Sequence, residues 1–352
     1  MSQLQDTGAV RQDRRHFLSA TAMAFAAARF GALASGNGPS SAFGPLKEVD
    51  AGVLRVVYAE AGPSDGIPAV LLHGWPYDIH AFADAAPLLA SRGYRVIVPY
   101  LRGLGPTRFL SEETPRNGQQ AALAVDTLAL LDALRIQRAV LAGFDWGARS
   151  AGIVAALWPE RCRALVSVSG YLIGSREAGR KPLPPQAELE WWYQYYFATE
   201  RGRAGYEQYR RDFARLIWRL ASPKWSFDDA TFERSAAALD NPDNVSIVIH
   251  NYRWRLSLAD GERSLDGLEA RLAAGPPIAV PTITLEGDAN GAPHPEPGSY
   301  ARKYSGKYQH RHITGGIGHN LPQEAPVAFA DAVVDADRMG TGIDRPPNAD
   351  TR

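Results

Sequence analysis

The sequence predicts an α/β fold with a mostly parallel sheet, helices on both of its faces and an inserted helical lid. Short apolar runs alternate with helical patterns from residue 54 to residue 168, and again from residue 281 to residue 336. Between residues 172 and 273 the alternation stops, and the chain becomes helical in pattern and rich in aromatic side chains. The chain has 352 residues, of which 45% are hydrophobic. This is enough for one large core with an inserted subdomain.

The composition argues against several classes of protein. Lysine plus arginine equals aspartate plus glutamate, at 38 each, which argues against a nucleic-acid-binding surface. No apolar run reaches the roughly 18 residues that a membrane span needs. The single cysteine, Cys162, allows no intrachain disulfide and no cysteine-based metal site. We expect Cys162 to be a packed residue without a catalytic role.

Residues 1–34 have the pattern of an export signal. The run Arg14-Arg15-His16-Phe17-Leu18 precedes an alanine-rich stretch and a possible cleavage site, Ala32-Leu33-Ala34. The arginine pair resembles a twin-arginine signal, which would place the protein in the periplasm or outside the cell. The alternative is an amphipathic or disordered arm. At the other end, residues 339–352 are rich in Gly, Pro and Asp and are expected to be disordered.

The core elements follow in order along the chain. We expect strands at residues 54–59, 69–72, 95–98, 139–142, 164–168, 281–286 and 308–313, and helices at residues 80–91, 121–134 and 323–336. Between the first two strands, Gly62-Pro63-Ser64-Asp65-Gly66 matches G-x-S-x-G but opens no helix, so it predicts a hairpin turn. The core therefore spans residues 45–171 and 274–338, and the lid spans residues 172–273.

The segment Gly143-Phe144-Asp145-Trp146-Gly147 has the pattern of a nucleophile elbow, because it joins an apolar strand to a helix rich in small residues. The flanking glycines fit this role, since the turn forces strained backbone angles and bulky neighbours would clash. The usual serine is replaced by Asp145, whose carboxylate can attack an electrophilic carbon and form an ester. The alternative is an ordinary strand–helix turn that carries a polar residue.

Ester chemistry at Asp145 requires a base that activates water and a group that holds this base. His319 follows the last predicted strand in a glycine-rich loop and is the candidate base. Asp288 follows the preceding strand and is the candidate orienting acid. Glu286 competes with it but lies within the strand. The order Asp145, Asp288, His319 matches the order nucleophile, acid and base.

A separate loop, His73-Gly74-Trp75-Pro76, supplies groups that can stabilise negative charge. It follows the predicted strand at residues 69–72, where a backbone N–H can point at a developing oxyanion. We assign the N–H groups of Trp75 and Trp146 to this oxyanion hole, and we expect His73 to brace the loop. The alternative is a simple turn at the end of the strand.

Together these motifs resemble the α/β-hydrolase superfamily, and within it the epoxide hydrolase branch, over about residues 45–338. Two lid segments extend the resemblance. The segment Trp192-Tyr193-Gln194-Tyr195-Tyr196-Phe197 is similar to the family segment that carries the first ring-opening tyrosine, and Asn251-Tyr252-Arg253 to the segment that carries the second. The resemblance therefore implies that Tyr193 and Tyr252 donate hydrogen bonds to an epoxide oxygen.

Some features leave alternatives open. Tyr195 and Tyr196 compete as donors, and lid packing alone is an alternative for all of these tyrosines. The sequence also departs from the family where Phe144 replaces a usual His and Tyr100 replaces a usual Asp.

The resemblance implies an enzyme that opens an epoxide to a diol through an ester on Asp145, with water activated by His319 and Asp288. It implies no cofactor and no metal. The aromatic lid favours a small apolar substrate, with Trp192 and Tyr196 as candidate contacts and water as the second substrate. One alternative is a haloalkane or haloacid dehalogenase that uses the same aspartate. The other is a non-catalytic ligand-binding protein on the same scaffold.

Overall fold

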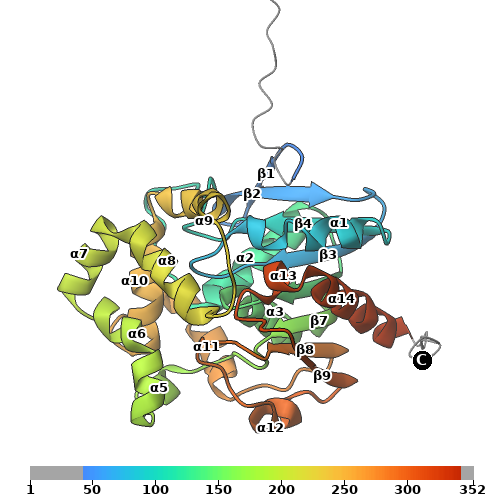
Figure 1. The fold of residues 1–352 in the computed structure, drawn as a ribbon. Helices are drawn as coiled ribbons and strands as arrows, with labels where there is room; N and C mark the ends of the chain where they lie inside the picture. Colours follow the sequence, from blue (N-terminus) through green and yellow to red (C-terminus); the bar gives the residue numbers. More distant parts are fainter. Residues whose placement is uncertain (1–42, 342–352) are drawn as a thin grey trace, which may run out of the picture. The chain divides into compact units, whose positions relative to one another are not determined.

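The computed structural model describes residues 43–341. Within this range the strands form one sheet in the order β1-β2-β4-β3-β6-β7-β8-β9, with β5 paired to β2 (Figure 1). The strands are β1 Lys47–Ala51, β2 Leu54–Ala61, β3 Ile67–Leu72, β4 Tyr94–Pro99, β5 Arg108–Phe109, β6 Ala139–Gly143, β7 Cys162–Val168, β8 Thr282–Gly287 and β9 Tyr308–Ile313.

The sheet is parallel from β4 to β9, whereas β2 runs antiparallel to its neighbours β1, β4 and β5. The central strand β6 is buried along its whole length, as expected for a parallel strand that is covered on both faces. Cys162, the first residue of β7, is fully buried, which confirms that it is a packed residue. The predicted fold class is confirmed.

Two pairs of helices cover the two faces of the sheet. On one face α1 (Ala85–Ala90) packs against α14 (Pro326–Thr341), and on the other α2 (Gln120–Ala133) packs against α3 (Trp146–Leu157) (Figure 1). Both α3 and α14 also contact β7. Small residues in α3 let it approach the sheet closely, and most of its side chains are buried. Among the described helices, none is both long and apolar enough to cross a membrane.

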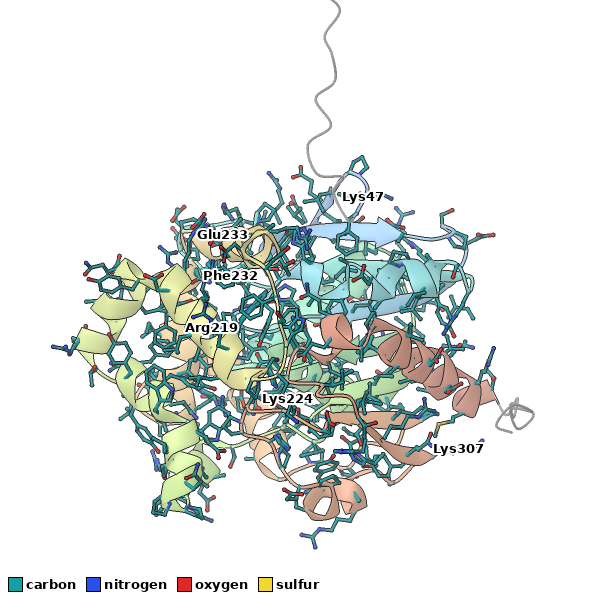
Figure 2. The ribbon with its side chains drawn as sticks, viewed as in Figure 1. Lys47, Arg219, Lys224, Phe232, Glu233 and Lys307 are labelled. Carbon is teal, nitrogen blue, oxygen red and sulfur yellow. The ribbon has the colours of Figure 1, made fainter. Side chains whose placement is uncertain are left out.

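The lid is inserted between β7 and β8, where the alternation of strands and helices stops in the sequence. Its helices are α4 Arg176–Gly179, α5 Pro185–Glu190, α6 Trp192–Phe197, α7 Glu200–Gln208, α8 Arg210–Ala221, α9 Asp229–Ala236, α10 Asn244–Arg255 and α11 Asp266–Ala273. Figure 2 shows Phe232 and Glu233 on α9 beside α8. The guanidinium of Arg215 on α8 lies 4.2 Å from the Phe232 ring centroid and 3.0 Å from a Glu233 carboxylate oxygen.

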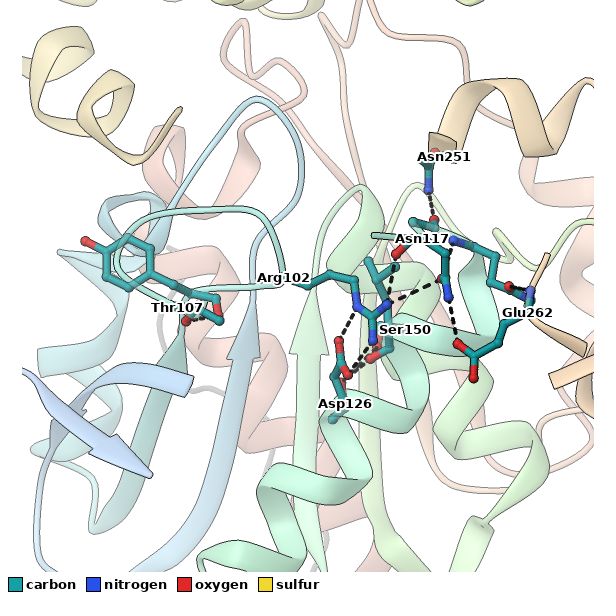
Figure 3. Close-up of polar contacts among 12 residues, drawn as sticks. Arg102, Thr107, Asn117, Asp126, Ser150, Asn251 and Glu262 are labelled. Carbon is teal, nitrogen blue, oxygen red and sulfur yellow. Dashed lines mark hydrogen bonds and ion pairs between the residues drawn. The ribbon is translucent and has the colours of Figure 1, made fainter. Parts of the chain in front are cut away.

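A buried network of hydrogen bonds and an ion pair connects the loop after β4 to α2 and to the lid (Figure 3). Arg102 donates to both carboxylate oxygens of Asp126, at 2.6 and 2.7 Å, and to the backbone oxygen of Asn117 at 2.8 Å. The Asn117 amide in turn donates to Glu262 of the lid at 2.9 Å. A bidentate arginine–carboxylate pair fixes both orientation and distance. The lid is therefore tied to the sheet domain by directional contacts as well as by packing.

Several predicted elements need correction. The turn at residues 62–66 is not a hairpin turn, because β4 lies between β2 and β3 in the sheet. The helix predicted at residues 80–91 is divided into a 3₁₀ turn, Ile79–Phe82, and α1. The last helix reaches Thr341, past the predicted start of the tail at residue 339. The predicted export signal and the rest of the tail lie outside the described residues.

Candidate active site

Asp145 lies at the sharp turn between β6 and α3, with backbone angles φ 52° and ψ −126°. A non-glycine residue at positive φ is strained, which fits the elbow that the sequence predicts. The turn also requires Gly147, since a Cβ there would lie 1.9 Å from the backbone oxygen of Leu72. The elbow therefore holds the Asp145 carboxylate at the carboxyl end of the central strand.

The loop after β3 forms a hydrogen bond with one oxygen of this carboxylate. The backbone N–H of Trp75 donates to Asp145 Oδ1 at 2.9 Å. A Cβ on Gly74 would lie 2.2 Å from the same oxygen, so only glycine permits this approach. The backbone N–H of Trp146 also lowers the pKa of this carboxylate. Both N–H groups that the sequence assigns to the oxyanion hole thus face Asp145.

His73 has the bracing geometry expected of it. Its Nδ1–H donates to the Gly74 oxygen at 3.1 Å, and its Nε2 accepts from the Leu101 N–H at 3.3 Å. Both contacts are satisfied by a neutral ring, and complete burial lowers the pKa of His73. Tyr100, which stands where the family usually has Asp, packs edge-on against this ring at a centroid distance of 6.4 Å.

His319 faces the second oxygen of Asp145, with Nε2 3.6 Å from Oδ2. Burial raises the pKa of Asp145, but the contact with His319 and the Trp146 N–H outweigh it, so the net pKa lies below its ordinary value. Asp145 is therefore ionised at neutral pH. The rings of Phe144 and Tyr77 pack against the imidazole, with centroid distances of 6.0 and 6.1 Å. Phe144 thus fills a packing position.

Asp288 does not hold His319. Its carboxylate accepts the backbone N–H groups of Gly315, Gly316 and Ile317 at 3.1, 2.8 and 2.8 Å. Desolvation raises the pKa of Asp288, but these donors outweigh it and the net pKa is lowered. Nδ1 of His319 is buried and has no hydrogen-bond partner among the described residues. The predicted contact between acid and base is thus replaced by one between Asp288 and the loop that leads to His319.

The competing carboxylate, Glu286, does not hold His319 either. It is buried, and its Oε1 accepts from the Asn290 amide at 2.7 Å and from the Gly287 N–H at 3.2 Å. Its position within β8 directs it toward this neighbouring loop.

A carboxylate that the sequence analysis did not select, Glu324 on α13 (Leu321–Glu324), lies beside His319. It accepts from the Ser222 hydroxyl and the Gly318 N–H, both at 2.7 Å, and the Ser222 oxygen accepts from the His319 N–H at 3.0 Å. Burial raises the pKa of Glu324, and these donors and the nearby charge of His319 reduce the shift without cancelling it, so the net pKa is raised. Glu324 and Asp288 thus brace the His319 loop from two sides.

Tyr193 on α6 and Tyr252 on α10 lie together, with their rings perpendicular and 5.3 Å apart. Both rings also pack against the Trp75 ring, with centroid distances of 5.8 Å for Tyr193 and 5.3 Å for Tyr252. Burial raises the pKa of both phenols, and the negative charge of Asp145 raises each further. The contacts with Trp75, and that between the rings of Tyr252 and Trp146 at 6.1 Å, place the pair beside the elbow. The raised pKa values keep the phenolic protons in place at neutral pH.

The competing tyrosines lie elsewhere. Tyr195 is 45% exposed, and its hydroxyl donates to Glu188. Tyr196 stacks on Phe213 with a centroid distance of 6.0 Å, and Trp192 packs against the same ring at 5.4 Å. Trp192 and Tyr196, which we expected to contact the substrate, therefore form part of the packing inside the lid.

A cavity of about 210 Å³ lies between α3 and the lid, and its lining includes Arg149, Trp191, Trp254 and Arg255. None of these four residues was predicted from the sequence to be at the site. A signal was available in Arg149, which stands one helical turn after Asp145 in a helix that is otherwise small and apolar. Arg255 and Trp191 carry no such signal, because only the folded lid brings them to α3.

The comparisons with known proteins agree with this architecture. A family model described as the alpha/beta hydrolase fold matches residues 68–229. The crystal structure of a candidate epoxide hydrolase from Klebsiella pneumoniae subsp. pneumoniae is 64% identical, covers 84% of this chain and 98% of that chain, and superposes with a TM-score of 0.84. The chain belongs to the α/β-hydrolase fold family.

Curated relatives match this hydrolase over shorter stretches. Epoxide hydrolase B of Mycobacterium tuberculosis is 32% identical over 157 residues, which cover 41% of this chain and 44% of that protein. The haloalkane dehalogenase of Mycobacterium marinum is 35% identical over 133 residues, which cover 37% of this chain and 42% of that protein. The hydrolase therefore spans less than half the length of these curated relatives.

Proposed function

We propose that the protein hydrolyses an epoxide to a diol through an alkyl ester on Asp145. The observation that carries this proposal is the asymmetric environment of the two Asp145 oxygens. Oδ1 accepts the Trp75 N–H at 2.9 Å, whereas Oδ2 lies 3.6 Å from His319 Nε2. A hydrogen bond in the ground state keeps Oδ1 in the oxyanion hole and leaves Oδ2 as the attacking atom.

In the first step Oδ2 attacks a ring carbon, the carbon–oxygen bond of the epoxide breaks, and an ester forms. Negative charge then develops on the ring oxygen, where the hydroxyls of Tyr193 and Tyr252 donate hydrogen bonds. The raised pKa values of both phenols keep these protons in place. The nucleophile needs no base in this step, because Asp145 is already ionised.

In the second step His319 takes a proton from water, and the hydroxide attacks Cγ of Asp145. The carbonyl oxygen of the ester is Oδ1, so the oxyanion forms where the N–H groups of Trp75 and Trp146 point. The intermediate collapses as its Cγ–Oδ2 bond breaks, and the alkoxide takes the proton from His319 and leaves as the second hydroxyl of the diol. The remaining proton of the attacking water is released as Asp145 regains its charge, and it replaces the proton that the ring oxygen took up in the first step. One oxygen of the restored carboxylate comes from water.

Dehalogenation is the second candidate, and a specific feature favours it. The buried indole Nε1–H of Trp146 forms no hydrogen bond of ordinary geometry with the described residues, although the indole is near enough to lower the pKa of Tyr252. Such a donor beside the nucleophile suits a leaving halide. The second indole at the site is engaged, because Trp75 Nε1 donates to the Tyr206 hydroxyl at 2.7 Å. The paired tyrosine donors favour the epoxide, since a departing halide needs no proton.

The test is a substrate screen of the purified full chain with epoxides and haloalkanes, in which diol and halide are measured separately. Diol formation is expected. A single turnover in water enriched in heavy oxygen then identifies the route. The label is expected in Asp145 after the first turnover and in the diol only later. Label in the diol from the first turnover would mean that water attacks the epoxide directly and that no ester forms.

A further inference from the structure

We infer that the cavity between α3 and the lid binds a carboxylate of the substrate, so that the enzyme acts on epoxides that carry a carboxylate group. This inference rests on the proposed function and replaces the expectation of a purely apolar substrate. The cavity has about 210 Å³ and is lined by residues of α3, of the segment that follows β7, and of α5, α6 and α10. In Figure 1, α6 and α10 lie side by side in the lid.

Two guanidinium groups at this cavity have no acidic partner. Neither Arg149 nor Arg255 forms a salt bridge with any Asp or Glu of residues 43–341. Arg149 donates one N–H, from Nε, to the backbone oxygen of Leu172 at 2.8 Å. Arg255 lies over the ring of Trp191 at 4.6 Å and over that of Tyr252 at 5.6 Å. Most of their N–H groups are therefore available to a ligand.

The two charges also act on each other. Burial lowers the pKa of Arg149 and the nearby charge of Arg255 lowers it further, whereas the charge of Asp145 raises it, and the resulting value is about 10. Cations that share a partly desolvated space are costly unless a negative charge compensates them. A bound anion would supply this charge, and the planar fork of arginine matches the two oxygens of a carboxylate.

The acidic residue that lines the cavity, Glu188, is committed to other partners. It accepts from the Leu183 N–H at 2.7 Å and from the Tyr195 hydroxyl, and both of these residues line the cavity as well. Lys181, which also lines the cavity, lies 3.7 Å from Glu177. The unpaired positive charge is therefore concentrated at Arg149 and Arg255.

The cationic wall adjoins the reacting groups. The N–H of Arg149 donates to the backbone oxygen of Asp145 at 3.1 Å, so the two residues lie one turn, or about 6 Å, apart along α3. On the lid side Arg255 covers Tyr252, and Trp191 contacts Tyr193 at 5.8 Å. The cavity is thus next to the tyrosine pair and to the first turn of α3, and a carboxylate held there would belong to a substrate that extends from Asp145 past these tyrosines. Trp191 and Trp254 offer apolar walls for the atoms between the carboxylate and the epoxide.

The test compares 3-phenylglycidate with its neutral amide, 3-phenylglycidamide, as substrates of the full chain. We expect a kcat/KM for the acid at least about tenfold above that for the amide. In Arg255→Gln we expect a loss of about ten- to hundredfold for the acid and less than about twofold for the amide, since one charged hydrogen bond is removed. The matched control is Arg253→Gln, two residues away on α10, whose guanidinium lies 3.6 Å from Glu200. It should leave both substrates unchanged.

Binding of the unreactive 3-phenylpropionate and its amide, measured by calorimetry, separates this inference from the proposed function. Tighter binding of the acid that is lost in Arg255→Gln supports the anion site even if no epoxide is hydrolysed. Turnover of both glycidyl substrates with equal efficiency, or an equal loss for both in Arg255→Gln, would overturn the inference and leave epoxide hydrolysis standing.

Discussion

Nε2 of His319 lies 3.6 Å from Oδ2 of Asp145, whereas the other carboxylate oxygen, Oδ1, accepts the Trp75 N–H. This position suits a base that acts after the ester has formed, because the water it activates must approach Cγ of Asp145. The orientation of the carboxylate is fixed by the Trp75 N–H, which binds the other oxygen, Oδ1. His319 is therefore not needed to hold the attacking oxygen in place.

His319→Gln should therefore form the ester and fail to hydrolyse it. We expect steady-state turnover to fall by at least about 100-fold, since general-base catalysis is removed. Mass spectrometry of the variant with a substrate of the intact enzyme should find one substrate mass added at Asp145. In a serine hydrolase the same change stops the first step. Absence of the adduct would mean that Asp145 is not the nucleophile.

Tyr193→Phe and Tyr252→Phe should each slow ring opening, by about 100-fold, and leave ester hydrolysis unchanged. The hydroxyls act only where charge builds on the epoxide oxygen, and loss of one such donor has an effect of this size. Single-turnover kinetics resolve the two steps. Tyr209→Phe is the matched control, because this lid tyrosine is 55% exposed and its hydroxyl accepts from the Gln208 amide. Equal slowing of both steps would assign the tyrosine pair to packing.

Asp288→Asn should slow ester hydrolysis by less than about tenfold. A carboxylate in contact with the imidazole would cost about 10,000-fold when it is changed to the amide. Asp288 instead binds the loop at Gly315–Ile317, so its loss affects His319 only through the loop.

Glu324→Gln should slow ester hydrolysis by about tenfold and leave ring opening unchanged. Glu324 acts as a positioning residue through Ser222 and Gly318, which fix the backbone around His319. Single-turnover rates of both steps and the activity of Glu324→Asp check this role. A larger loss in Asp288→Asn than in Glu324→Gln would reverse the assignment of the two carboxylates.

The pH dependence of ring opening should be flat from about pH 5 to about pH 9. Asp145 has a lowered pKa, so it stays ionised until the pH falls well below 5. The tyrosine pair has raised pKa values, so the phenols stay protonated past their ordinary pKa of about 10. Rapid-mixing measurements of ester formation across this range provide the check. A rate that declines between pH 7 and pH 5 would contradict it.

We propose that residues 1–34 direct export, and the arginine pair gives the test. Changing Arg14 and Arg15 together to Lys should leave the protein in the cytoplasm, because the twin-arginine route reads these two side chains. Cell fractionation measures the outcome. Changing Arg11 to Lys should have no effect and serves as the control. Export of the double variant at the normal level would refute the assignment.

The sequence was sufficient for features that depend on local pattern. The alternation of strands and helices predicted the sheet, the last strand was placed at its observed residues 308–313, and the loss of alternation marked the lid. The elbow was readable because its glycines serve a local steric need at Asp145. The edge strand β1 was missed, since its charged, mostly exposed residues lack an apolar pattern.

Features that depend on the direction of a side chain were not readable. Asp288 has the position in the chain that is expected of the acid that orients His319. Its carboxylate instead accepts hydrogen bonds from three backbone N–H groups of a glycine-rich loop. The cavity could not be predicted from the sequence either, because Arg149 and Arg255 lie on different helices that only the folded lid brings together. The resemblance pointed to Tyr193 and Tyr252 as the donor pair, and the structure brings their rings within 5.3 Å. Trp192 was expected to contact the substrate, but it packs inside the lid, and Trp191 lines the cavity.

The lid leaves the sheet after β7 and returns at β8, and these two strands are parallel neighbours. The whole lid is thus one long crossover, and closing such a connection costs only about 0.6 kcal/mol more for each doubling of its length. Lids of different length and composition can therefore be exchanged during evolution with little penalty to the sheet. Asp145 and His319 belong to the sheet domain, whereas Arg255, Trp191 and the tyrosine pair belong to the lid. In such a lineage the reaction would be inherited with the sheet, and the choice of substrate would change with the crossover.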